Sequence, residues 1–130
     1  MNLWWQQILV VGVGGALGSI GRFLTSEWMT KLAGRGFPWG TLTVNLLGSL
    51  LAGLLFAWLA GREGAAAWLR MLLMVGVLGG FTTWSSFALE TLLLGRGSGV
   101  GLAGAYVLSS LLGGLVLVWF GFRLGMGLRG

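Results

Sequence analysis

Histidine, cysteine and aspartate are absent from this chain of 130 residues, and proline occurs once. Without histidine and cysteine the chain cannot form a disulfide, a thiol nucleophile or the usual zinc sites, and it has no histidine base. No nucleophile–base pair can be assembled from what remains, so we predict that the protein is not an enzyme. Charge is also scarce, at 8% of residues against roughly 25% in a soluble domain. So little charge cannot cover a soluble surface.

Apolar residues fill the sequence instead. They make up 56% of the chain, the mean hydropathy is +0.91, and four long stretches carry no charge: 1–21, 36–61, 71–89 and 97–122. A helix needs about 20 apolar residues to cross the core of a bilayer. We therefore predict an all-α membrane protein in which residues 1–130 form a single four-helix transmembrane domain, with helices at about 3–30, 38–60, 67–94 and 99–123. Most tryptophans fall near a predicted helix end, as an interfacial aromatic belt requires.

Positive charge is divided evenly between the two predicted sides of the membrane. The side of the chain ends has Arg62, Arg70, Arg123 and Arg129, and the other has Lys31, Arg35 and Arg96, with Arg22 if its side chain reaches the interface. The positive-inside rule then selects neither orientation, so we predict insertion both ways (dual topology) and an antiparallel homodimer. The net charge of +5 flanks the membrane, and no basic face for nucleic acid is expected.

Small residues recur at a spacing of four in each predicted helix. The pairs are Gly14 and Gly18, Ser49 and Gly53, Gly76 and Gly80, and Ser109 and Gly113. Small residues at this spacing let helix backbones approach closely in lipid. A nucleotide-binding interpretation fails, because no strand precedes the glycines and no phosphate-binding lysine follows them. We therefore expect these pairs to mark tight helix packing.

Polar residues within the predicted helices form two stripes. One consists of Thr41, Asn45 and Gly48 in the second helix, the other of Tyr106, Ser110 and Gly114 in the fourth. Polar groups at membrane depth are costly, so each must be hydrogen-bonded or serve a function. Two such stripes in an apolar bundle favour a polar lane, although ordinary interhelical hydrogen bonds would explain any one residue alone.

Residues 76–87 interrupt the third predicted helix near its middle with the sequence GVLGGFTTWSSF. Three glycines followed by hydroxyl side chains predict a break in the helix. The freed carbonyls would suit a small cation, whereas the N–H groups that open the second half, capped by Thr82 or Thr83, would favour an anion. Trp84 and Phe87 share a face, and their positive ring edges could hold a small anion, although core packing also explains two aromatics at this spacing.

Three stretches, taken in order, resemble the Fluc/CrcB fluoride channel family. They are GGALGSIGRF at 14–23, GTLTVNLLG at 40–48, and GGFTTWSSF at 79–87 followed by Glu90. The four-span layout fits the family as well. The resemblance implies passive export of cytoplasmic fluoride through two antiparallel pores in a dimer, across the cell (inner) membrane of a prokaryote. It also implies a structural sodium ion (Na+) at the centre of the dimer.

The resemblance assigns roles to particular residues. The fluoride pathway is expected to include Thr41, Asn45, Thr83, Trp84, Ser86, Phe87, Tyr106 and Ser110. Arg22 would line the aqueous approach, and backbone carbonyls of Gly79 and Thr82 would hold the sodium ion. This chain departs from the family pattern at two positions, because it has Trp84 where phenylalanine is usual and Gly114 where serine is frequent.

Two other functions are compatible with a chain of this size. A small four-helix multidrug/proton antiporter can also be an antiparallel dimer, but it needs a carboxylate inside its first helix. Here that helix offers Glu27, close to its end. A subunit that only supports the assembly of other proteins would leave the predicted break and the polar stripes unexplained.

Overall fold

The fold is seen in a computed structural model that describes residues 3–130. Across these residues every regular element is a helix, and four spans of 31, 21, 33 and 29 residues are long and apolar enough to cross a membrane. The elements are α1 (Leu3–Ala33), α2 (Trp39–Leu59), α3 (Ala65–Leu69), the π-helix η1 (Arg70–Leu78), α4 (Gly79–Phe81), α5 (Trp84–Gly97) and α6 (Val100–Leu128). The predicted all-α fold with four spans is therefore confirmed, and the third span is the one divided into several elements.

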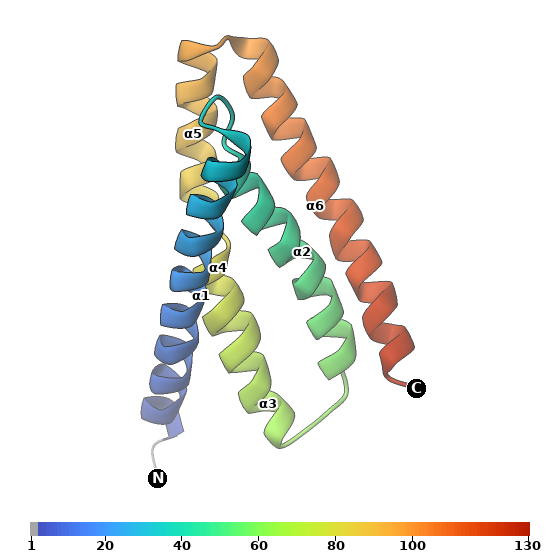
Figure 1. Ribbon diagram of the computed structural model, residues 1–130. Helices are drawn as coiled ribbons and strands as arrows, with labels where there is room; N and C mark the ends of the chain where they lie inside the picture. Colours follow the sequence, from blue (N-terminus) through green and yellow to red (C-terminus); the bar gives the residue numbers. More distant parts are fainter. Residues whose placement is uncertain (1–2) are drawn as a thin grey trace.

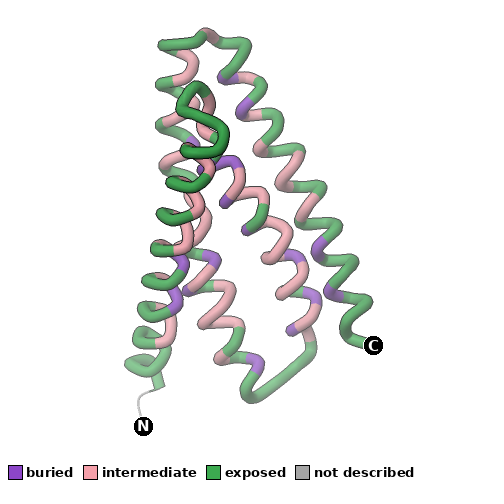
Figure 2. Tube along the Cα trace, in the orientation of Figure 1, coloured by how far each residue is buried: buried purple, intermediate pink, exposed green. Residues whose placement is uncertain are grey.

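Helix α2 lies at the centre of the bundle. It runs along α6, while α1 packs against η1 and α4, and α5 packs against α6 (Figure 1). Buried residues concentrate on the faces that these helices turn toward one another, and the outer faces are exposed (Figure 2). The start of α1 and the end of α6 lie at the same end of the bundle, as an even number of spans requires (Figure 1).

Glycines allow the closest backbone contacts, as the spacing of small residues predicts. A Cβ atom on Gly14 would lie 3.0 Å from the Cα of Gly76, and one on Gly18 would collide with the carbonyl oxygen of Val77. Between α2 and α6, however, the tightest contacts on the α6 side involve Gly121 and Gly125, which face the carbonyls of Leu50 and Leu54. Gly121 and Gly125 are also four residues apart, but they are not among the predicted pairs.

Several helices run past their predicted ends. Helix α1 continues from the expected residue 30 to Ala33, where Gly34 (φ +84°) donates its N–H to the Thr30 carbonyl at 2.9 Å and ends the helix. Helix α6 continues from the expected residue 123 to Leu128. The fourth span was predicted to end at its first charged residue, but Arg123 stays helical and its guanidinium lies 5.8 Å from the ring centroid of Trp119. An arginine at the interface does not need to end a helix.

The third span is interrupted at Thr82 and Thr83, and we call these two residues the break. Both residues are extended, with φ and ψ of −85° and 157° for Thr82 and of −150° and 119° for Thr83. The glycines that suggested the break, Gly79 and Gly80, are themselves still helical in α4. They matter because a Cβ on Gly80 would collide with the carbonyl of Gly15, so glycine brings the break against α1.

Candidate functional site

Asn45 of α2 holds the break in place. Its Nδ2 donates to the carbonyl oxygen of Thr83 at 2.9 Å, and its Oδ1 accepts from the Thr83 N–H at 2.8 Å. The carboxamide thus forms the same pair of bonds with an extended residue that a neighbouring antiparallel strand would form. Lipid offers no partner to an unwound backbone, so this pairing satisfies groups that would otherwise be very costly to bury.

The two threonines of the break finish the two half-helices. The Thr83 hydroxyl accepts from the N–H of Ser86 at 3.2 Å and donates to the Ser86 hydroxyl at 3.1 Å, so Thr83 is the N-cap of α5. Thr82 instead donates its hydroxyl to the Leu78 carbonyl at 2.9 Å and belongs to the first half. Of the two caps that the sequence offered, the structure uses Thr83.

Three backbone carbonyls at the break lose their helical partners. In a continuous helix the N–H groups of Thr83, Ser85 and Ser86 would donate to Gly79, Phe81 and Thr82. Here the N–H groups of Thr83 and Ser86 donate to the Asn45 carboxamide and the Thr83 hydroxyl, and among the described residues none donates to the Phe81 carbonyl. The Gly80 carbonyl accepts from Arg22 Nε at 3.0 Å. The freed oxygens are therefore those of Gly79, Phe81 and Thr82.

Two cavities meet at Thr83, which lines both. The first cavity, of about 670 Å³, lies between α1, the segment 34–38, the start of α2 and α5. The second cavity, of about 440 Å³, lies on the other side of the break, where Asn45 of α2, Ser110 of α6 and Trp84 of α5 line it. The break therefore stands between two open spaces inside the bundle.

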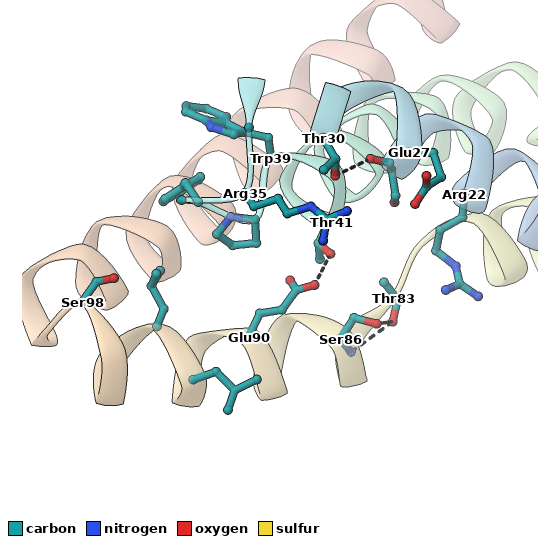
Figure 3. A pocket seen from close by; sticks show the side chains of 18 residues that line it. Arg22, Glu27, Thr30, Arg35, Trp39, Thr41, Thr83, Ser86, Glu90 and Ser98 are labelled. Atoms are coloured by element: carbon teal, nitrogen blue, oxygen red, sulfur yellow. Dashed lines mark hydrogen bonds between the residues drawn. The ribbon is translucent and has the colours of Figure 1, made fainter. Parts of the chain in front are cut away.

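The first cavity is polar and balanced in charge. Two arginines and two glutamates line it, together with several hydroxyl groups: Arg22, Arg35, Glu27, Glu90, Ser26, Thr30, Thr41, Thr83, Ser86 and Ser98. Figure 3 shows the Arg35 side chain extending toward Thr41 and Glu90, while Arg22 lies on the side of Thr83. Cationic groups at both sides of a cavity lower the cost of bringing an anion from water to the break.

Glu90 has a structural role that the sequence pattern did not predict. Its Oε1 accepts from the Thr41 hydroxyl and its Oε2 from the Tyr106 hydroxyl, each at 2.8 Å. The carboxylate thus joins α5 to α2 and α6. Glu90 lies near the end of the third span, where a charged residue is ordinary. The spacing of Glu90 from the cap Thr83 places it two turns into α5, and this was the signal available.

Three aromatic rings contact one another in tilted pairs across α5 and α6. The ring centroids of Trp84 and Phe87 lie 5.2 Å apart, and those of Phe87 and Tyr106 lie 5.1 Å apart. Trp84 and Phe87 line the second cavity, whereas Tyr106 is 0% exposed and lines neither cavity. Trp84 is 71% exposed, although it lies beside the break in the middle of a span.

Comparison with known proteins identifies the family. Residues 9–122 match the family described as "CrcB-like protein, Camphor Resistance (CrcB)". The chain belongs to the CrcB-like family. The "Fluoride-specific ion channel FluC" of Xanthomonas euvesicatoria pv. vesicatoria is 51% identical over 124 residues, which cover 95% of this chain and 92% of the relative. The protein of the same name from Thermus thermophilus is 48% identical over 126 residues, covering 96% and 98%.

This CrcB-like chain brings most of its predicted site residues together. Asn45, Thr83, Trp84, Phe87 and Ser110 line the second cavity, and Arg22, Thr41, Thr83 and Ser86 line the first. Ser110 Oγ is buried and has no hydrogen-bond partner within residues 3–130. Tyr106 is held apart in the core by Glu90. With its four spans and its bacterial relatives, the chain is a multi-pass membrane protein of a prokaryote.

Proposed function

We propose that this protein is a fluoride channel of the cell membrane, and not an enzyme, which lets cytoplasmic fluoride leave passively and so gives resistance to fluoride. The observation that carries the proposal is the break itself. Asn45 holds it open between a charged cavity on one side and a cavity lined by hydroxyl, amide and aromatic groups on the other. Relatives that share about half of the sequence over nearly its whole length are named fluoride-specific ion channels.

Fluoride would enter by the first cavity and pass the break into the second. Arg22 and Arg35 attract the anion to the first cavity, where Thr41 and Ser86 supply hydroxyl groups. Thr83 lines both cavities and gives the transition between them. Asn45 and the unpartnered Ser110 hydroxyl follow in the second cavity, because a selective site must replace the hydration shell of fluoride with donors.

The aromatic rings form the apolar wall of this pathway. The edges of Trp84 and Phe87 carry positive potential and hold an anion without the grip of a full charge. Trp84 adds an indole N–H that a phenylalanine would lack. Tyr106 lies behind these two rings and supports them, since its ring packs on Phe87 and its hydroxyl donates to Glu90.

We infer that the working unit is an antiparallel homodimer with two pores. The exposure of Trp84 beside the break supports a partner over this face, because an indole N–H in mid-membrane needs covering. A structural sodium ion on the dimer axis fits the freed carbonyls of Gly79 and Thr82, since hard cations prefer oxygen ligands. Such an ion would neutralise the carbonyl dipoles of two facing breaks and so hold the protomers together.

Passive transport suffices for fluoride export. Hydrogen fluoride enters cells as a neutral weak acid and dissociates in a near-neutral cytoplasm, which traps the anion. A membrane potential that is negative inside then drives the anion out, at about 2.3 kcal/mol per charge per 100 mV.

The decisive experiment loads liposomes that contain the purified protein with fluoride and follows efflux with a fluoride electrode. Fluoride should leave rapidly and chloride should not. Efflux no faster than from protein-free liposomes would refute the function.

A further inference from the structure

Two arginine side chains, those of Arg70 and Arg129, reach the turn 59–62 that follows α2, at the end of the bundle where α6 also ends (Figure 1). Arg70 donates through Nη2 to the carbonyls of Leu59 and Arg62, the latter at 2.9 Å. Arg129 Nη2 lies 3.2 Å from the point that a Cβ on Gly61 would occupy. Arg62 is itself part of the turn.

This cluster, Arg62, Arg70 and Arg129, has too few acidic neighbours to be neutral. The chain contains three acidic side chains, and two of them, Glu27 and Glu90, line the first cavity. Glu63 is the one that remains near the turn. Three guanidinium groups gathered on four residues repel one another, and an external anion would remove this cost.

The cluster lies at the level of the membrane surface. The Arg62 guanidinium carbon is 4.9 Å from the ring centroid of Trp58, near the end of α2, and tryptophan rings sit at the height of lipid headgroups. Arg62 and Arg129 are exposed, so both can reach a ligand, whereas Arg70 already uses Nη2 on the turn. Guanidinium groups pair with phosphate through two parallel hydrogen bonds.

We propose that Arg62, Arg70 and Arg129 form a binding site for the phosphate headgroup of an anionic phospholipid. Arg70 shapes the turn, and Arg62, in the turn, and Arg129, directly after α6, contact the phosphate from its two sides. The site is separate from the two cavities and does not depend on which ion the protein conducts. It would fasten the turn between α2 and α3 to the end of α6 through a lipid that the membrane always supplies.

Native mass spectrometry of the purified full-length protein, titrated with phosphatidylglycerol or phosphatidylcholine, tests this site. Wild type should retain phosphatidylglycerol in preference to phosphatidylcholine. The double variant R62Q/R129Q should bind phosphatidylglycerol roughly 25-fold more weakly, at about fivefold for each arginine, which is ~1 kcal/mol converted at 1.4 kcal/mol per tenfold. Arg70 is left intact because it holds the end of α2.

The matched control K31Q/R96Q removes two exposed charges from the opposite end of the bundle. It should keep wild-type affinity for phosphatidylglycerol, and both double variants should elute as wild type does and conduct fluoride normally. Equal losses in the two variants would reduce the effect to general charge attraction and overturn the proposal. Displacement of the lipid by an equal concentration of inorganic phosphate would overturn it too, because the site would then select phosphate and not a lipid.

Discussion

Asn45 and Glu90 each form hydrogen bonds through both of their polar side-chain atoms, in every case with residues outside their own helix. Asn45 pairs with one residue, Thr83, as donor and as acceptor. Glu90 accepts from two hydroxyl groups, those of Thr41 and Tyr106. An amide is required at the first position because it must both donate and accept, and a carboxylate at the second because it must only accept. Aspartate has nearly the shape of asparagine, and glutamine nearly that of glutamate, but each replacement changes which atoms can donate and accept. Each position can therefore be tested by its own substitution.

Asn45→Asp should nearly abolish fluoride efflux. An aspartate cannot donate to the Thr83 carbonyl, and it would place a negative charge beside the proposed path of an anion. An unpaired buried carbonyl costs about 1–3 kcal/mol, which is a factor of about 5 to 150, and the repulsion of the anion adds to it; the loss of flux is measured in liposomes with a fluoride electrode. Thr43→Val, on the same helix but lining neither cavity, also removes a polar group and should conduct normally. Undiminished efflux through the aspartate variant would contradict the proposed pathway.

Glu90→Gln should weaken the bundle. A glutamine offers one acceptor oxygen, so either Thr41 or Tyr106 loses its partner. Because Tyr106 is fully buried, we expect a loss of about 1–3 kcal/mol in stability, seen as a lower melting temperature in detergent. Glu63→Gln, in the exposed loop before α3, removes the same charge and should melt as wild type does. Identical melting of the two variants would mean that the Glu90 bonds contribute nothing.

The helices of this bundle approach one another most closely where a glycine, which has no side chain, lets two backbones come into contact. Gly14 and Gly18 of α1 meet η1, and Gly121 and Gly125 of α6 meet α2. Lipid tails are as apolar as leucine, so burial alone does not hold these helices together, and close packing must do so. Side-chain size at these positions therefore controls stability more than hydrophobicity does.

Gly18→Ala should destabilise the protein, because the added methyl group would collide with the Val77 carbonyl of η1. Over-packing of this kind costs about 1–3 kcal/mol. Gly12→Ala is the matched control on the same helix, since a Cβ there meets no other described atom within 4 Å. Its better helix propensity should leave stability unchanged or raised by up to ~1 kcal/mol. Thermal unfolding in detergent distinguishes the two, and an equal melting temperature for both would refute the close-contact argument.

The elements show what the sequence could and could not predict. Charge-free stretches predicted four spans, and glycines followed by hydroxyl groups predicted the break and a cap at Thr82 or Thr83, of which the structure uses Thr83. The pairing of Asn45 with Thr83 joins residues 38 positions apart and leaves no local pattern. The π-helix η1 was likewise not predicted, because its wider turns depend on packing and not on residue preference. The contacts of Glu90 were not predicted either, because its partners Thr41 and Tyr106 lie 49 and 16 positions away in the sequence.

At the scale of the whole molecule, a single chain leaves its most unusual surface open. The break, the freed carbonyls of Gly79 and Thr82, and the exposed Trp84 all belong to the third span. A two-fold axis in the membrane plane would bring two copies of this region together and cover both. Such a dimer needs chains inserted in opposite directions, and the even distribution of positive charge permits this.

Dual insertion can be measured directly, because the chain has no cysteine of its own. Ser98→Cys introduces a thiol between α5 and α6, and Gly127→Cys introduces one near the end of α6, at the opposite end of the bundle (Figure 1). A membrane-impermeant maleimide added outside intact cells should label about half of each variant, since a chain with balanced flanking charge enters in both orientations. Complete labelling of one variant with none of the other would show a single orientation. An antiparallel dimer could not then form, and both pores that depend on it would be lost.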